Sequence, residues 1–185
     1  MCTGGIWSAD VEPTHSVTAQ AERDRVNLNA FNAVASNFKQ YFSQLVHSQE
    51  AEIRNGPPNA TDETTPAQSL EQVHFAIRST ASSNTHWKAG TTELSGGQKT
   101  LLALAFTLAI AQFKPSPLYI LDEVDAALDE RNQGKFTALV AQVLGTQCRC
   151  QTIAISHHSD FQRGASRSVH SYDNYYNIMY PGIIQ

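Results

Sequence analysis

The chain has 185 residues, a formal net charge of −4 and three cysteines. That length can hold one domain with a real core, and 41% hydrophobic with 16% charged residues is the composition of a soluble globular chain. The negative charge excludes a nucleic-acid footprint over the whole chain, while it allows a local basic patch or DNA binding by a larger assembly. The sparse cysteines, Cys2, Cys148 and Cys150, indicate a reducing compartment, and residues 1–10 lack the basic start and apolar run of a secretory signal.

The first third of the chain predicts a helix followed by a loop and a short strand. Apolar residues recur there at three- and four-residue spacing, which places them on one helical face, assigned to the core in preference to a partner-binding surface. They are Phe31, Val34, Ala35, Phe38, Phe42, Leu45 and Val46. Gly56 and the two prolines after it are predicted to stop this helix. The polar residues 57–69 predict a surface loop, and the alternation over residues 73–78 predicts a half-buried strand.

Two motifs in the second half of the chain are the most informative. Residues 93–98 (Glu-Leu-Ser-Gly-Gly-Gln) open a long apolar helix, where unpaired N–H groups and the helix dipole can hold an anion. The apolar run 101–113 is shorter than the roughly twenty residues that span a bilayer, which favours a buried core helix and no membrane segment. Residues 118–123 (Leu-Tyr-Ile-Leu-Asp-Glu) predict a buried strand that delivers two carboxylates, Asp122 and Glu123, to its C-terminal end.

From Leu118 onward the chain predicts one β-α-β unit. A helix is expected to start near Asp129, a good N-cap residue, and to end at Gly145. Its apolar stripe consists of Phe136, Leu139, Val140, Val143 and Leu144. A second strand, residues 152–156, is expected to run parallel to the first by the right-handed crossover rule. His157 and His158 then fall on the same sheet edge as the two carboxylates.

These residues support a resemblance to a known family. Residues 94–98 resemble the signature of ABC-type ATPases, residues 119–123 resemble a Walker B strand, and residues 124–129 resemble the D-loop that follows it. The run 113–129 is similar to the C-terminal half of the ATPase head of structural maintenance of chromosomes (SMC) proteins, and residues 84–88 further resemble the condensin subunit of that family. The close likeness covers residues 84–129 and continues loosely to about Tyr172.

The resemblance implies an α/β fold of the P-loop-NTPase (ABC) type, a head half with a mainly parallel sheet flanked by helices. Residues 1–56 would be a helical segment at the end of a coiled-coil arm, and residues 57–92 a loop with a short strand. Residues 93–172 would hold the signature helix, the Walker B strand, the D-loop and the switch region. Residues 173–185 would be a C-terminal tail, rich in tyrosine, to which the resemblance assigns nothing.

The resemblance also implies roles for individual residues. In SMC heads two subunits sandwich ATP, so Ser95, Gly96, Gly97 and Gln98 would contact the γ-phosphate bound to an opposing head. Asp122 would hold Mg²⁺ and Glu123 would activate the attacking water, whereas without the signature the two would be solvated acids.

The resemblance also implies roles for residues of the D-loop and for the switch position. Asp125 and Asp129 would lie in the D-loop at the dimer interface, with plain helix capping as the alternative for Asp129. His157 would match the switch histidine of many ABC-type ATPases, the alternative being an exposed histidine at the sheet edge.

One element of an ATP site is missing from the sequence. A P-loop needs Gly-x4-Gly-Lys followed by Ser or Thr, but the only Gly-Lys pair, Gly134-Lys135, is followed by Phe136 and has Asp129 where the first glycine should be. The sequence therefore predicts half of an ATPase head, which hydrolyses ATP only when an N-terminal P-loop half complements it. The chain would be a fragment, a truncated product or one part of a two-chain site.

The implied assembly has several further members. They are a second SMC head in a heterodimer, a kleisin-type subunit, and DNA through the whole complex, in the nucleus on chromosomes or in a bacterial nucleoid. The function would be chromosome condensation and organisation. The alternatives are half of another ABC-type ATPase that acts in DNA repair, and a catalytically inert interaction module that retains the motifs by descent.

Overall fold

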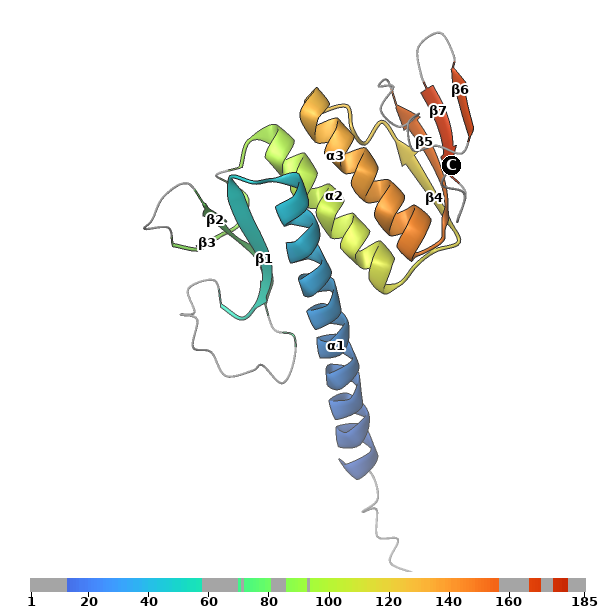
Figure 1. Ribbon diagram of the computed structural model, residues 1–185. Helices are drawn as coiled ribbons and strands as arrows, with labels where there is room; N and C mark the ends of the chain where they lie inside the picture. The colour runs from blue at the N-terminus through green and yellow to red at the C-terminus, as the bar shows by residue number, and fades with distance from the viewer. Residues whose placement is uncertain are drawn as a thin grey trace, which may run out of the picture.

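The computed structural model describes residues 13–57, 70, 72–80, 86–92, 94–156, 167–170 and 175–179, with side chains from residue 18 to residue 156. Its elements follow the chain as α1 (Pro13–Leu45), β1 (Gln49–Asn55), β2 (Val73–Ser79), β3 (Lys88–Ala89), α2 (Gly96–Phe113), β4 (Leu118–Asp122), α3 (Glu130–Val140), the π-helical turn η1 (Ala141–Gln147), β5 (Gln151–Ser156), β6 (Arg167–His170) and β7 (Tyr175–Met179). Three helices lie between a small sheet and a larger one, and the N-terminal part of α1 projects away from both (Figure 1).

Helix α1 ends earlier than the helical segment 1–56 that the sequence suggested. Helix α1 ends at Leu45, and the segment 49–55, which was expected to be helical, is strand β1. The reason is that the spacing of the buried residues changes from the helical three or four to two. Glu50, Glu52 and Arg54 alternate with the buried Ala51 and Ile53, which is the two-residue repeat of a half-buried strand. Gly56 therefore ends a strand, not a helix.

The small sheet has the order β1-β2-β3 with antiparallel pairs, Gln49 lying opposite Ser79 and Asn55 opposite Val73. The larger sheet has the order β4-β5-β7-β6. Strands β4 and β5 are parallel, as predicted, whereas β7 runs antiparallel to both β5 and β6. Residues 175–179, assigned to a C-terminal tail, are thus an inner strand of this sheet. The predicted loop 57–69 lies almost wholly outside the described residues.

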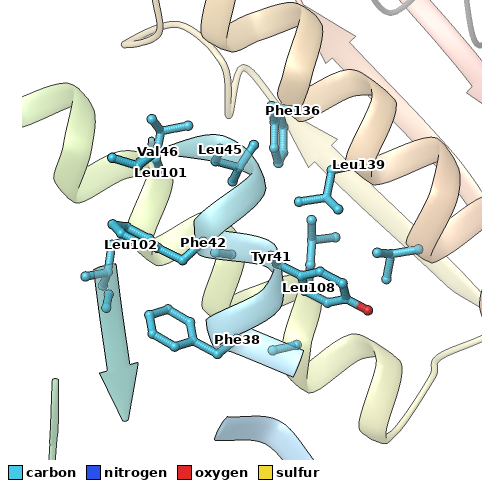
Figure 2. Packing of buried hydrophobic residues seen from close by; sticks show 14 of the residues in the cluster. Phe38, Tyr41, Phe42, Leu45, Val46, Leu101, Leu102, Leu108, Phe136 and Leu139 are labelled. Atoms are coloured by element: carbon cyan, nitrogen blue, oxygen red, sulfur yellow. The ribbon is translucent and has the colours of Figure 1, made fainter. Parts of the chain in front are cut away.

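The core forms where α1, α2 and α3 meet, with the labelled side chains of all three helices converging in Figure 2. Phe38 lies at its centre, with ring centroids 5.9 Å from Phe42, 5.4 Å from Phe75 and 6.2 Å from Phe106. Burial of one such side chain contributes about 1.5–3 kcal/mol, so this cluster fixes α1 on α2. The predicted stripe of α1 is confirmed. Helix α2, predicted to be buried, is buried on one face only, because Ile110 and Phe113 are 43% and 45% exposed. In the described part of the chain no helix is long and apolar enough to cross a membrane.

The third helix starts as predicted and ends differently. Asp129 caps α3 through a hydrogen bond of 2.8 Å from the Asn132 amide. All five residues of the predicted stripe are buried: Phe136, Leu139, Val140, Val143 and Leu144. Gly145, however, does not end the helix but lies inside η1, whose wider turn is closed by the Cys148 amide on the Val143 carbonyl at 2.8 Å.

Strand β4 is not buried on both faces, contrary to the prediction. Leu118 and Ile120 are 43% and 64% exposed. Among the described strands β4 pairs only with β5, so it is an edge strand of the larger sheet. Helices cover the face that carries Tyr119 and Leu121, and the opposite face lies open. The apolar residues 118–121 therefore form a strand that is covered by helices on one face only, although an apolar run of this kind predicts burial on both faces.

Candidate nucleotide-binding site

The start of helix α2 places four predicted site residues together. Ser95 is the N-cap, and its Oγ accepts a hydrogen bond from the Gln98 amide at 3.3 Å. The Gln98 Oε1 in turn accepts one from the Ser95 amide at 3.0 Å, which completes a capping box. The capping role uses a lone pair of the Ser95 oxygen, so the hydroxyl hydrogen is still available as a donor. The helix mouth therefore presents donors while its own cap is satisfied.

The two signature glycines are not required by the packing of this chain. A Cβ on Gly96 would meet no atom of the described residues within 4 Å, and one on Gly97 would lie 3.5 Å from the Ala127 carbonyl oxygen, an ordinary contact. Their N–H groups occupy the first two helical positions, which have no intrahelical partner. Open space beside unpaired donors at a positive helix end fits an anion, and a methyl group would narrow that space.

The end of strand β4 carries the two carboxylates on the surface. Asp122 and Glu123 are both exposed. Glu123 has a φ of +49°, in the left-handed region, which costs a non-glycine residue on the order of 1–3 kcal/mol. Its amide donates to the Ile155 carbonyl at 2.8 Å, just past the last β4–β5 pair, Asp122 with Ile155. The strained backbone turns the chain sharply away from the sheet at the acid expected to act as base.

Asp125 does not lie where the sequence placed it. This side chain is 1% exposed, so it cannot contact a nucleotide or an opposing head at the surface. Its Oδ2 accepts a hydrogen bond of 2.6 Å from the Ser156 Oγ, and its Oδ1 has no partner in the described part of the chain. Ser156 was missed as a partner. The signal was its place on the buried face of β5 with Thr152 and Ala154, where a small polar residue implies a partner.

Asp129 has the capping role that was its alternative reading. Its two carboxylate oxygens accept from the amide and the side chain of Asn132, at 2.8 and 3.2 Å. The residue is nevertheless exposed, so an additional surface contact is sterically open. The turn before it is fixed by the Gln133 side chain, which donates to the Leu128 carbonyl at 2.7 Å.

A Cβ on Gly97 would lie 3.5 Å from the Ala127 carbonyl oxygen, so the mouth of α2 lies beside the turn that follows Glu123. His157 lies outside the described residues. Within them, no group of three acidic, histidine or cysteine side chains could hold a metal. Burial raises the pKa of the Cys148 and Cys150 thiols, which makes both poor metal ligands at neutral pH.

A second arrangement beside the signature was missed at the sequence level. The guanidinium groups of Arg54 and Arg78 lie 4.5 and 4.6 Å from the ring centre of Trp87. Arg78 also pairs with Glu50 at 2.6 Å. The stacked side chains hold strands β1 and β2 to the segment 86–92, which leads into the signature. Cation–π pairs between residues this distant in sequence carry no local pattern that would reveal them.

The fold and these motifs define an α/β ATPase head of the SMC type. The computed model matches solved Smc heads with TM-scores of 0.61 and 0.60, each at 25% identity. The first is an Smc head with a coiled coil and joint from Pyrococcus yayanosii, covering 89% of this chain and 29% of that one. The second is an Smc head bound to the C-winged helix domain of ScpA, covering 86% and 46%.

The family model described as the RecF/RecN/SMC N terminal domain matches residues 8–177. The chain therefore belongs to this family. It is also 38% identical to structural maintenance of chromosomes protein 2 of Xenopus laevis over 138 residues, which are 74% of this chain and 10% of that protein. The chain thus spans about a tenth of the length of this curated relative.

One expectation from the sequence is overturned by this result. The chain was assigned to the C-terminal half of an SMC head, but the matching model is that of the N terminal domain and covers nearly the whole chain. The physical reason is that the motifs at the start of α2 and the end of β4 are local. They describe one surface and carry no information about where this segment lies in a longer protein. That assignment had rested on the likeness of residues 113–129 to the C-terminal half and on the missing P-loop.

Proposed function

We propose that this chain supplies the signature and Walker B surfaces of an SMC-type ATPase head, which binds and hydrolyses ATP between two engaged heads. The observation that carries the proposal is the helix mouth at Ser95. Its glycines have no packing role inside the chain, yet they keep space open beside unpaired N–H donors. Membership of the SMC family gives that space its ligand class, a nucleotide phosphate.

The remaining site residues divide into two groups. Ser95, Gly96 and Gly97, with the side-chain amide of Gln98, would face the γ-phosphate of the ATP held by the opposing head. Asp129 would lie beside them at the interface of the heads. The helix dipole of α2 would add to the attraction for the phosphate, because its positive end lies at this mouth.

At the strand end, Asp122 would hold Mg²⁺ and Glu123 would orient and deprotonate the attacking water. Magnesium is commonly held by one or two carboxylates, with phosphate oxygens and water completing six ligands, so a single exposed carboxylate suffices here. When bound, the ion neutralises charge on the phosphates. His157 would contact the γ-phosphate as a switch residue, because it follows β5, the strand that pairs with β4.

The P-loop must come from another polypeptide segment, because the sequence has none. The open face of β4 fits such a segment. Leu118, Ile120 and Asp122 are exposed alternate residues of one strand and share that face, so a segment that covers the two apolar side chains would lie next to the proposed magnesium ligand.

The whole assembly would organise and condense chromosomes in the nucleus, and DNA would bind to the complex as a whole. Helix α1 would be the end of a coiled-coil arm, since much of its N-terminal part is exposed and projects from the head (Figure 1). A kleisin-type subunit is a further expected partner, by analogy with the Smc head bound to ScpA. The resemblance to protein 2 of the SMC family supports a condensin role.

The test of this function is Glu123→Gln in a head reconstituted with a P-loop-bearing segment. Removal of a general base costs about 10²–10⁴-fold in rate, so turnover should fall by that factor while ATP binding persists and engaged dimers accumulate. Glu130→Gln is the matched control, because Glu130 is an exposed acid in the first turn of α3. Unchanged turnover in Glu123→Gln would show that Glu123 is not the base.

A further inference from the structure

Two side-by-side links tie the turn after β4 to the end of β5. The Glu123 amide donates to the Ile155 carbonyl at 2.8 Å, and the next residue of β5, Ser156, donates its hydroxyl to Asp125 at 2.6 Å. The parallel ladder itself ends one residue earlier, where Asp122 lies opposite Ile155. These two hydrogen bonds therefore continue the pairing of β4 and β5 beyond the last ladder pair. The bond to Ile155 joins backbone atoms, and the bond to Asp125 joins side chains.

The left-handed conformation of Glu123 needs support on both sides. Before it, the β4 ladder fixes Asp122. After it, the chain turns through hydrogen bonds from the Ala126 amide to the Glu123 carbonyl, 3.1 Å, and from the Leu128 amide to the Asp125 carbonyl, 3.0 Å. Two side chains of this turn are buried, Leu128 in the apolar core and Asp125 through its hydrogen bond to Ser156. A strained residue persists only where its surroundings determine it, and Asp125 is the nearer of these two anchors on its C-terminal side.

Stability alone does not account for this anchor. Asp125 is 1% exposed with one carboxylate oxygen lacking a partner among the described residues, and a buried acid with an unsatisfied oxygen is costly compared with an apolar side chain of similar size. The hydrogen bond between Asp125 and Ser156 is buried, costs stability and lies directly beside Glu123, the strained candidate base. Such an arrangement is typical of residues that hold a catalytic side chain in place.

We propose that Asp125 and Ser156 are positioning residues that hold the Glu123 carboxylate in its working direction. Neither residue touches nucleotide, because both are buried. The inference rests on the proposed function, in which Glu123 activates water. It also replaces the interface role that the sequence suggested for Asp125.

The first test uses this chain alone and measures amide hydrogen exchange. Ser156→Ala removes the side-chain link, so exchange at the Glu123 amide should accelerate at least tenfold. The Gln133 amide, which donates to the Asp129 carbonyl at 2.9 Å, should not change and serves as the internal reference. Thr152→Val is the matched control, because Thr152 is a buried β5 hydroxyl on the same face with no partner among the described residues. Equal exchange at Glu123 in Ser156→Ala and in the unaltered chain would overturn the inference.

The second test measures turnover and ATP affinity in the head reconstituted with a P-loop-bearing segment. Ser156→Ala and Asp125→Asn should each lower kcat at least tenfold with the Kd for ATP unchanged. The first removes the hydroxyl donor of the link, and the second replaces its charged acceptor by a neutral and weaker one. The double variant should be no slower than the slower single one, because both substitutions act on the same link. Thr152→Val should keep normal turnover. Additive losses in the double variant, or normal kcat in both singles, would contradict the proposal.

Glu123→Gln in the same assembly separates this inference from the proposed function. If Glu123→Gln turns over normally, the proposed function is wrong, whatever the exchange experiment shows. If Glu123→Gln is slow while Ser156→Ala and Asp125→Asn are normal, Glu123 is the base and its positioning by this pair is refuted. The Asp125→Asn variant also covers the case in which Ser156→Ala does not fold.

Discussion

At the scale of single residues, Gly96 and Gly97 allow the requirements of the fold to be distinguished from those of a bound ligand. Gly96 has no close neighbour among the described residues at the position of a Cβ, and neither it nor Gly97 has a left-handed backbone. An alanine can therefore be introduced without internal strain, and it restricts the chain as a helix former would. A loss of ATPase activity in such an alanine variant would then be due to a lost contact with a ligand or a partner, since the fold itself is unaffected.

We predict that Gly96→Ala folds with unchanged stability, or gains up to about 1 kcal/mol, while ATP turnover of the reconstituted head falls at least tenfold. Gly134→Ala is the control, because that glycine in α3 has equally open space around its Cβ and lies in no predicted contact surface. Chemical denaturation and steady-state ATPase assays on both variants decide the point. Normal turnover in Gly96→Ala would show that the open space is not used by a phosphate.

Ser95 offers a complementary test, because its capping and ligand roles respond oppositely to a carboxylate. Aspartate is as good an N-cap as serine and its charge favours the positive helix end. We predict that Ser95→Asp keeps the stability of the chain within about 0.5 kcal/mol and abolishes engagement of the reconstituted heads, since two anions would then face each other. Sedimentation of the ATP-bound head measures engagement.

At the scale of elements, the joint between α1 and the small sheet depends on one ionised acid. Glu52 on β1 lies 2.5 Å from the Lys39 ammonium on α1 and 3.2 Å from the Arg54 guanidinium. Burial raises the pKa of this carboxyl, but the hydrogen bonds and charges of Lys39 and Arg54 outweigh burial and hold its pKa below the ordinary 4.5. Because the folded pKa is the lower one, the stabilisation is present above the unfolded value and is lost as pH falls through the folded one.

We therefore predict that Glu52→Gln lowers the free energy of unfolding by about 0.5–1 kcal/mol at pH 7 and that this difference vanishes as the pH falls well below 4.5. Urea denaturation at pH 7 and pH 3 measures it. Glu22→Gln is the control, because the Glu22–Arg25 pair on α1 is mostly exposed and screened. An unchanged difference at pH 3 would show that the ionised carboxylate is not the source of the stabilisation.

The elements also show where sequence reasoning succeeds and where it fails. Helices α2 and α3 were predictable because their caps and apolar runs are local signals, as Ser95 and Asp129 illustrate. Strand β1 was missed because the apolar stripe of α1 passes directly into a charged segment that alternates, and Ala51 is too small to mark a strand. The end of α3 was missed because a π-helical turn has the apolar stripe of an α-helix and differs only in its hydrogen bonds.

The site was predictable in part for the same reason. Ser95 is capped by Gln98, three residues away, and Asp122 ends the apolar strand β4, so both lie at the helix mouth and strand end where they were expected. Glu123 follows directly, but its backbone is held by Ile155 of β5. Asp125 was misplaced because its environment is set by Ser156, across the parallel pair and far along the chain. The left-handed backbone of Glu123 has no signature in composition, since glycine is the residue that usually marks it.

At the scale of the whole molecule, the larger sheet is open on the side of the candidate site. Strand β4 has one described neighbour, and its uncovered face shows Leu118 and Ile120 beside Asp122. Exposed apolar side chains on an edge strand are a liability for a chain that remains alone, because such edges pair with other polypeptides. Under the proposed function a P-loop-bearing segment would dock at this same edge, so one surface would account for both observations.

We predict that Ile120→Lys leaves the isolated chain intact but blocks its complementation by a P-loop-bearing segment. Ile120 is 64% exposed here, so the substitution should change the free energy of unfolding by no more than about 0.5 kcal/mol. Covering an isoleucine contributes about 1.5–3 kcal/mol, so the affinity for the segment should fall roughly 10- to 100-fold, and restored ATPase activity should fall with it. Val73→Lys is the control, because Val73 is 54% exposed on β2 of the other sheet. Titration of the labelled segment with each variant gives both affinities, and equal values for Ile120→Lys and Val73→Lys would mean that the partner docks elsewhere.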